Sequence, residues 1–177
     1  MTNTKDKAEK FVDLHRGPKA FVIANPWDAG SARILAGLGF QALATSSGAS
    51  AGVLGRRDGR VTRDEALAHA RAIVEAVELP VSADLEKGFG DRPEDAAETI
   101  RLAGEVGLVG GSIEDATGDK DRPLYDFNQA VERVAAAVNM WIGVARAGYS
   151  FMDELPIFLV IFLLPSAVAV AVKWKLL

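Results

Sequence analysis

Short apolar runs and longer amphipathic segments alternate along the chain as far as about residue 138. Runs with the length and composition of buried strands occupy four segments, residues 20–24, 41–45, 80–84 and 109–113. A segment with helical spacing of apolar residues follows each run, at residues 29–38, from 62 onward, from 91 onward and at 126–138. A Ser/Gly-rich loop, residues 46–59, precedes the second helix. Alternating strands and helices predict a parallel sheet with right-handed crossovers.

Two of the predicted helices have recognisable start signals. Thr62 is followed three residues later by Glu65, the spacing of a capping box, and Asp91 is followed by Glu94 in the same way. After Thr62, apolar residues recur at helical spacing and predict one stripe that faces the core: Ala66, Ala70, Ile73 and Val77.

Acidic residues stand at the ends of two neighbouring predicted strands. Asp84 ends one apolar run and Glu114 ends the next, 30 residues later, which is the length of one strand-helix-strand step. Because parallel strands end at the same edge of a sheet, we expect both carboxylates at that edge. Carboxylates gathered there are typical of sites that hold hard metal ions.

Composition limits the class of protein. The 177 residues are 49% hydrophobic and 25% charged, enough for one domain with a sizeable core. The net charge of −4 and the absence of basic runs argue against a nucleic-acid partner. The chain has no cysteine, which excludes disulfides, thiolate metal ligands and cysteine nucleophiles. Residues 1–10 are too polar for a signal peptide, so we expect a cytoplasmic location.

The pattern changes after residue 138. Residues 155–172 carry no charge over 18 positions, which is marginal for a membrane span of roughly 20 apolar residues. Pro156 and Pro165 weaken a regular helix there. We therefore predict a domain at residues 1–138 and a hydrophobic tail at residues 139–177, with membrane association through the tail as an alternative location.

Four segments carry a resemblance to a known family: residues 25–33, 44–50, 81–90 and 112–115. In this order and at this spacing, over about residues 8–138, they resemble the phosphoenolpyruvate mutase/isocitrate lyase superfamily. The resemblance implies an α/β fold of the (β/α)8 TIM-barrel type, Mg²⁺ as cofactor, and cleavage or formation of a C–C or C–P bond next to a 2-oxo acid through an enolate intermediate. Because a complete barrel takes about 250 residues, we expect a partial barrel of the first four βα units. The tail is then foreign to the family, as a frameshift, truncation or fusion would produce.

The resemblance also implies metal ligands. Asp84 matches the main metal-site aspartate of the family, and Glu114 matches a glutamate that holds metal-bound water. Ser82 stands where the family often has a second aspartate. Glu86 is a candidate substitute, because it lies on the same face as Asp84 if the strand continues.

Further site residues follow from the same resemblance. The substrate carboxylate and enolate oxygen are expected at Ser46, Ser47 and Gly48, with Trp27 at the start of the family pattern. Asp58 matches a loop aspartate near the transferring group, and Lys120 approximates a lid lysine. The loop at residues 115–121 lacks the cysteine acid of isocitrate-lyase-type enzymes, so we do not expect a true isocitrate or methylisocitrate lyase.

The sequence leaves other readings open. Asp84 and Glu114 also suit helix caps or partners of arginine, residues 46–48 suit a turn, and Asp58 before Gly59 is a turn signal. His15 and His69 are expected on helix surfaces. The predicted function is a Mg²⁺-dependent lyase that acts on a small 2-oxo acid. We also expect the protein to associate with copies of itself. The alternatives are an inactive half-barrel that associates through its open sheet edges and a membrane-tethered binding module anchored by residues 155–172.

Overall fold

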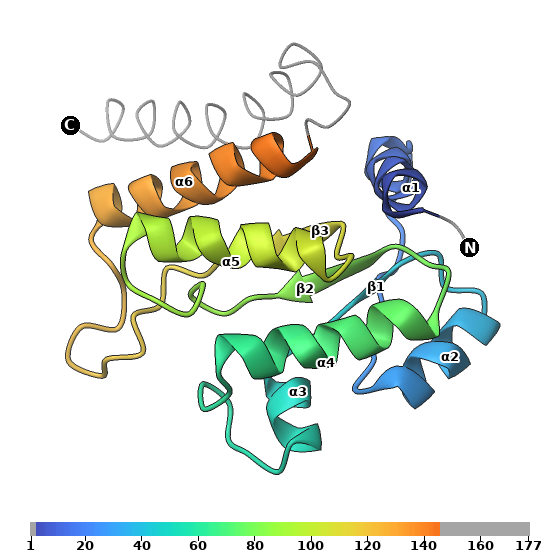
Figure 1. Ribbon diagram of the computed structural model, residues 1–177, viewed down its shortest axis with the longest axis horizontal. Helices are drawn as coiled ribbons and strands as arrows, with labels where there is room; N and C mark the ends of the chain where they lie inside the picture. The colour runs from blue at the N-terminus through green and yellow to red at the C-terminus, as the bar shows by residue number, and fades with distance from the viewer. Residues whose placement is uncertain (1–2, 146–177) are drawn as a thin grey trace. The chain divides into compact units, whose positions relative to one another are not determined.

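The computed structural model of the chain describes residues 3–145 (Figure 1). The chain divides into two compact units, residues 1–141 and 142–177. Within residues 3–145, no helix is both long and apolar enough to cross a membrane. The apolar run at residues 155–172 lies outside the described residues, so the predicted tail stays a prediction.

Three parallel strands form one sheet in the order β1-β2-β3: Leu43–Ala44, Val81–Asp84 and Gly110–Ser112. Leu43 pairs with Val81, and Ser82 pairs with Gly110. The predicted parallel sheet is therefore confirmed. The first predicted strand, residues 20–24, is reduced to one parallel bridge between Ala24 and Leu43.

Helices surround this sheet, and Figure 1 shows α4 and α5 alongside the strands. Their bounds are α1 Thr4–Arg16, α2 Ala29–Gly37, α3 Ser47–Val53, α4 Arg63–Ala76, α5 Pro93–Glu105 and α6 Phe127–Ala145. The four predicted helices are present, although α6 continues past residue 138. The sequence pattern did not predict α1 or α3. Asn3 caps α1, since its side chain accepts the Asp6 N–H at 2.9 Å.

The start of α4 agrees with the prediction. The Glu65 N–H donates to the Thr62 hydroxyl oxygen at 3.4 Å, and the Thr62 N–H donates to Glu65 Oε2 at 2.9 Å. These two bonds form a capping box and satisfy donors that have no partner inside the helix.

The start of α5 differs from the prediction by one residue. Arg92, not Asp91, is the N-cap, and its N–H donates to Asp95 Oδ2 at 3.0 Å. The reason is Pro93, whose fixed φ and missing N–H suit the first helical position. The Asp91 carboxylate is left to make contacts outside the helix.

Apolar residues of α4, α5 and the strands form the core: Leu43, Leu67, Ala70, Ile73, Val77, Val81, Ala83, Leu85, Ala96, Ile100 and Ala103. On β2 the buried positions alternate with half-buried ones. Because side chains of a strand alternate between its faces, Val81 and Ala83 face the core while Ser82 and Asp84 lie on the opposite face. This alternation places the Asp84 carboxylate on the face opposite the buried side chains of Val81 and Ala83.

Candidate functional site

Asp84 is the last residue of β2, and hydrogen bonds fix its side chain. One carboxylate oxygen accepts the Ser47 N–H at 3.0 Å, and the other accepts the Glu86 N–H at 3.0 Å. The Asp84 N–H donates to the Thr45 hydroxyl oxygen at 3.3 Å. The carboxylate therefore lies where the ends of β1 and β2 meet, as the sequence predicted for this edge.

The chain turns sharply after Asp84. Glu86, Gly88 and Phe89 all have positive φ values, of 49°, 80° and 58°. The premise that the strand continues to Glu86 is therefore wrong. Glu86 nevertheless stays beside Asp84 through its N–H bond, and its carbonyl oxygen accepts the Glu114 N–H at 2.8 Å. The turn thus brings the two glutamates to the same edge as Asp84.

Four acidic side chains influence one another at this edge. Burial raises the pKa of the Glu86 carboxyl, and neighbouring carboxylates raise it further. These neighbours are Asp58, Asp84 and Glu114. Partial burial also raises the pKa of Glu114 and is the largest cause. The negative charges of Asp84 and Asp58 raise it further. Asp58 also lies beside α3, since a Cβ added to Gly48 would stand 3.7 Å from its Oδ2. The edge carries a concentration of negative charge.

The donor set suits a hard divalent ion. Carboxylate oxygens are the ligands that Mg²⁺ prefers, and the ion is commonly held by one or two of them with several waters completing its shell. Within residues 3–145, no three His, Asp or Glu side chains stand close enough together to enclose a metal ion. The fit therefore rests on the type of donor atom and on the concentration of negative charge, and water molecules would complete the coordination shell.

The segment at residues 46–48, expected as part of a loop, instead begins a helix. Ser46 is the N-cap of α3, and its hydroxyl accepts the Ala49 N–H at 3.4 Å. The Ser47 N–H is already bound to Asp84. The prediction of an open loop over residues 46–59 is thus wrong for its first part, because the Ser46 cap allows the small residues after it to form a helical turn.

A small cavity of about 10 Å³ adjoins the acids. Its lining includes Thr45, Ser47, Ser50, Asp84, Glu86 and Phe89. This volume is close to what one water molecule needs, and the lining offers several polar partners. The cavity therefore suits a single water molecule next to Asp84.

His69, on α4, links two distant segments. Its Nε2 lies 2.7 Å from the Trp27 carbonyl oxygen, and its Nδ1 lies 3.0 Å from the Ser50 hydroxyl. A carbonyl can only accept, so Nε2 carries the proton and, in the neutral ring, Nδ1 accepts from Ser50. His69 lies half-exposed on α4, in agreement with the expected helix surface, but both of its ring nitrogens are hydrogen-bonded. No sequence signal marks these contacts, because the partners are 19 and 42 residues away.

The Trp27 residue itself is 63% exposed.

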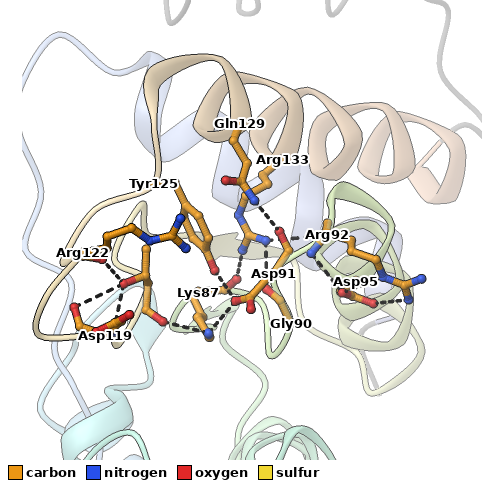
Figure 2. Close-up of polar contacts among 11 residues, drawn as sticks. Lys87, Gly90, Asp91, Arg92, Asp95, Asp119, Arg122, Tyr125, Gln129 and Arg133 are labelled. Carbon is orange, nitrogen blue, oxygen red and sulfur yellow. Dashed lines mark hydrogen bonds and ion pairs between the residues drawn. The ribbon is translucent and has the colours of Figure 1, made fainter.

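The structure does not bring Lys120 to the acids. It lies exposed in the segment between β3 and α6. Lys87 does connect this segment to the turn after β2, since its Nζ donates to the Thr117 carbonyl at 2.8 Å and to Asp91 Oδ1 at 2.6 Å. The Tyr125 hydroxyl donates to the same Asp91 oxygen at 2.6 Å (Figure 2). Lys87 first, and then Tyr125, lower the pKa of Asp91.

Comparison with known proteins decides the family. The family model for phosphoenolpyruvate phosphomutase matches residues 11–144. The chain belongs to the phosphoenolpyruvate mutase/isocitrate lyase superfamily. The resemblance inferred from the sequence is thereby confirmed, and the parallel sheet with its surrounding helices agrees with the α/β fold of solved superfamily structures.

Relatives within the superfamily have names that refer to small carboxylates. The chain is 34% identical over 140 residues to 2,3-dimethylmalate lyase of Eubacterium barkeri, covering 75% of this chain and 48% of the relative. It is 32% identical over 146 residues to 2-methylisocitrate lyase of Escherichia coli K12, covering 72% and 49%. A crystal structure from Burkholderia cenocepacia J2315, described as a lyase/mutase, superposes with a TM-score of 0.75 at 56% identity, covering 77% of this chain and 49% of the other. The chain spans about half the length of the curated relatives it matches.

Proposed function

We propose that this chain provides the cation-binding and substrate-binding part of a Mg²⁺-dependent lyase that acts on a small 2-oxo acid through an enolate intermediate. The observation that carries the proposal is the group of four carboxylates around the end of β2, namely Asp84 with the loop residues Asp58, Glu86 and Glu114, in which Glu86 and Glu114 have raised pKa values. Such perturbed groups at one edge of an α/β sheet are typical of functional sites. Superfamily relatives named as lyases of small carboxylates support the reaction class.

Asp84, Glu86 and Glu114 are the proposed metal ligands, directly or through water. A bound divalent cation supplies positive charge that lowers the cost of forming an enolate next to a carboxylate. Asp84 is held by two backbone N–H groups, so its orientation is set before a cation arrives. Glu86 and Glu114 contribute negative charge that a bound cation would neutralise.

Ser46, Ser47 and Gly48 are the proposed contacts to the substrate carboxylate and enolate oxygen. Because the Ser47 N–H is bound to Asp84, the proposed donors are the Ser47 hydroxyl and the Gly48 N–H. Trp27 is proposed at the rim of the site, where its side chain is exposed.

Asp58 and Lys120 are the proposed catalytic residues. Asp58 stands beside Gly48 and within electrostatic reach of Glu86, next to the proposed substrate contacts. Lys120 lies in an exposed segment after β3, so its role would require that segment to approach the acids. The chain has no cysteine, and true isocitrate lyase activity is therefore not proposed.

A Mg²⁺ titration followed by thermal unfolding tests the cation site. A ligand that binds only the folded protein raises the unfolding midpoint. We expect a rise in the parent protein, its loss in Asp84→Ala, and a normal rise in Asp13→Asn, which removes one exposed acid from α1. A cooperatively unfolding parent with no response to Mg²⁺ would contradict the proposal.

Substrate screening then tests the reaction class. With Mg²⁺ present, 2,3-dimethylmalate and, in separate assays, other small 2-oxo and 2-hydroxy acids are incubated with the protein, and release of a 2-oxo acid product is measured. An inactive half-barrel is the competing hypothesis, supported by the half-length match to the relatives. Cation binding without turnover of any small 2-oxo or hydroxy acid would favour that hypothesis. The division into residues 1–138 and 139–177, and self-association, remain predictions.

A further inference from the structure

Arg133 on α6 is a buried cation, with only 1% of its surface exposed. It forms no ion pair with a carboxylate of residues 3–145, and its Nε has no hydrogen-bond partner there. Burying a charge is costly unless other groups compensate it. The groups that accept hydrogen bonds from the guanidinium are therefore not carboxylates.

Main-chain carbonyls of the turn after β2 accept these hydrogen bonds. The Arg133 guanidinium donates to the carbonyl oxygen of Gly90 at 2.8 Å, to that of Lys87, and at 3.4 Å to that of Arg92. Its central carbon lies 4.3 Å from the centre of the Tyr125 ring. Figure 2 shows the guanidinium of α6 reaching toward this turn. One side chain thus holds three carbonyls within six consecutive residues.

The same turn contains the backbone strain noted above. Glu86 and Phe89 adopt the left-handed conformation that residues with a Cβ rarely occupy. Such conformations persist only where the surrounding structure enforces them, and they are common at functional sites. Arg133 binds the carbonyl of Lys87, the residue immediately after Glu86.

Packing restrains the turn from another side. A Cβ added to Gly88 would stand 3.1 Å from Ala96 Cα on α5 and 3.4 Å from Ile113 Cδ1. The turn is therefore fixed between the guanidinium of α6 and the surface of α5. Neither restraint involves a carboxylate of the acid group, which consists of Asp58, Asp84, Glu86 and Glu114.

We infer that Arg133 is a positioning residue whose guanidinium holds the strained turn after β2 and so places the Glu86 carboxylate in the acid group. This inference rests on the proposed function for the role of Glu86, but not for the hold on the turn. An arginine suits the task because its planar fork donates in several fixed directions, whereas a lysine offers a single compact charge.

Arg133→Lys tests the inference, with Arg101→Lys as the matched control. Arg101 lies on α5 and pairs with Glu98 and Glu105 at the surface, so its replacement keeps the same charge without touching the turn. Supporting residues around metal ligands typically contribute about 10–100-fold to metal affinity. We expect calorimetric Mg²⁺ affinity to fall by about tenfold or more in Arg133→Lys and to stay near the parent value in Arg101→Lys. Gly88→Ala, which disturbs the same turn without altering Arg133, should weaken binding as well.

Hydrogen exchange in the metal-free protein separates this inference from the proposed function. The Gly88 N–H donates to the Leu85 carbonyl at 2.8 Å, within the turn. We expect this amide to exchange faster in Arg133→Lys, while the amides of α4 keep their parent rates. If the parent binds no Mg²⁺, the proposed function fails and the exchange result alone decides the inference.

Arg133→Gln, which keeps an N–H donor but buries no charge, provides a second variant if Arg133→Lys does not fold. Parent-like exchange of the turn in a folded variant would overturn the inference. Failure of both variants to fold would also overturn it, because the residue would then support the whole fold instead of the turn.

Discussion

Replacing Gly88 by alanine separates two ways in which a side chain can disturb the turn after β2. Gly88 has a φ of 80°, and its added Cβ would lie 3.1 Å from Ala96 Cα and 3.2 Å from Ala96 Cβ. The substitution therefore strains the backbone and presses against α5. Gly59 provides the control, because its φ is 70° and an added Cβ would meet nothing within 4 Å.

The expected cost is the sum of two terms. Left-handed backbone costs an alanine about 1–2 kcal/mol relative to glycine, and both variants carry this term. Overpacking against a backbone that cannot move freely costs about 1–3 kcal/mol more, and only Gly88→Ala carries it. We therefore expect unfolding free energies lowered by about 3 kcal/mol for Gly88→Ala and about 1 kcal/mol for Gly59→Ala.

Urea unfolding of the three proteins measures this difference. If the denaturant dependence of the unfolding free energy stays constant, the shift in midpoint reports stability alone. A loss in Gly88→Ala no larger than that in Gly59→Ala would refute the reasoning, since it would show that α5 yields to the added methyl group.

Three further predictions concern the core, the acids and the histidine link. Ile73 is fully buried, so Ile73→Ala should lower the unfolding free energy by about 2–5 kcal/mol in urea titrations, and a loss below 1 kcal/mol would show a core that collapses around the gap. Burial and neighbouring carboxylates raise the pKa of Glu86, so the folded state binds a proton on this carboxyl more tightly than the unfolded state does. The metal-free protein should therefore gain stability as the pH falls from neutral toward the ordinary glutamate pKa of about 4.3. Glu86→Gln should be more stable than the parent at pH 7, with a smaller difference at pH 5; equal pH slopes of the urea midpoint would contradict this. His69→Ala leaves the Trp27 carbonyl and the buried Ser50 hydroxyl without their partner, which should cost about 1–3 kcal/mol, whereas Ser50→Ala in the same background should add little.

Local signals were sufficient for much of the fold. The capping box at Thr62, the apolar stripe through Ile73 and the strand ending at Asp84 all depend on neighbouring residues, and each agrees with the structure. The start of α5 shows how a local signal can mislead. Asp91 has the sequence pattern of a cap, but Pro93 occupies the first helical position, so Arg92 is the N-cap. The Asp91 carboxylate accepts a hydrogen bond from Lys87 instead.

Site features that depend on distant residues could not be predicted. Spacing alone placed Asp84 and Glu114 at one edge, because a parallel sheet brings consecutive strand ends together. The left-handed turn at Glu86 had no sequence signal, since non-glycine residues adopt it only under tertiary restraint. The restraining contact joins Arg133 to a carbonyl 46 residues away, and a lone arginine on an amphipathic helix looks the same whether it is buried or solvated.

The parallel sheet also sets the order in which the protein can fold. Helices α4 and α5 have their start signals within a few residues, so they can form on the submicrosecond scale of local structure. The bond between Ser47 and Asp84 spans 37 residues, and Thr45 and Asp84 are 39 apart. Closing such loops costs entropy before any contact compensates it, which slows non-local pairing. During synthesis Asp84 leaves the ribosome before Glu114, whose N–H binds the Glu86 carbonyl. The four carboxylates should therefore come together late in folding, after α4 and α5 have formed. Cation binding should then appear as a slow phase during refolding.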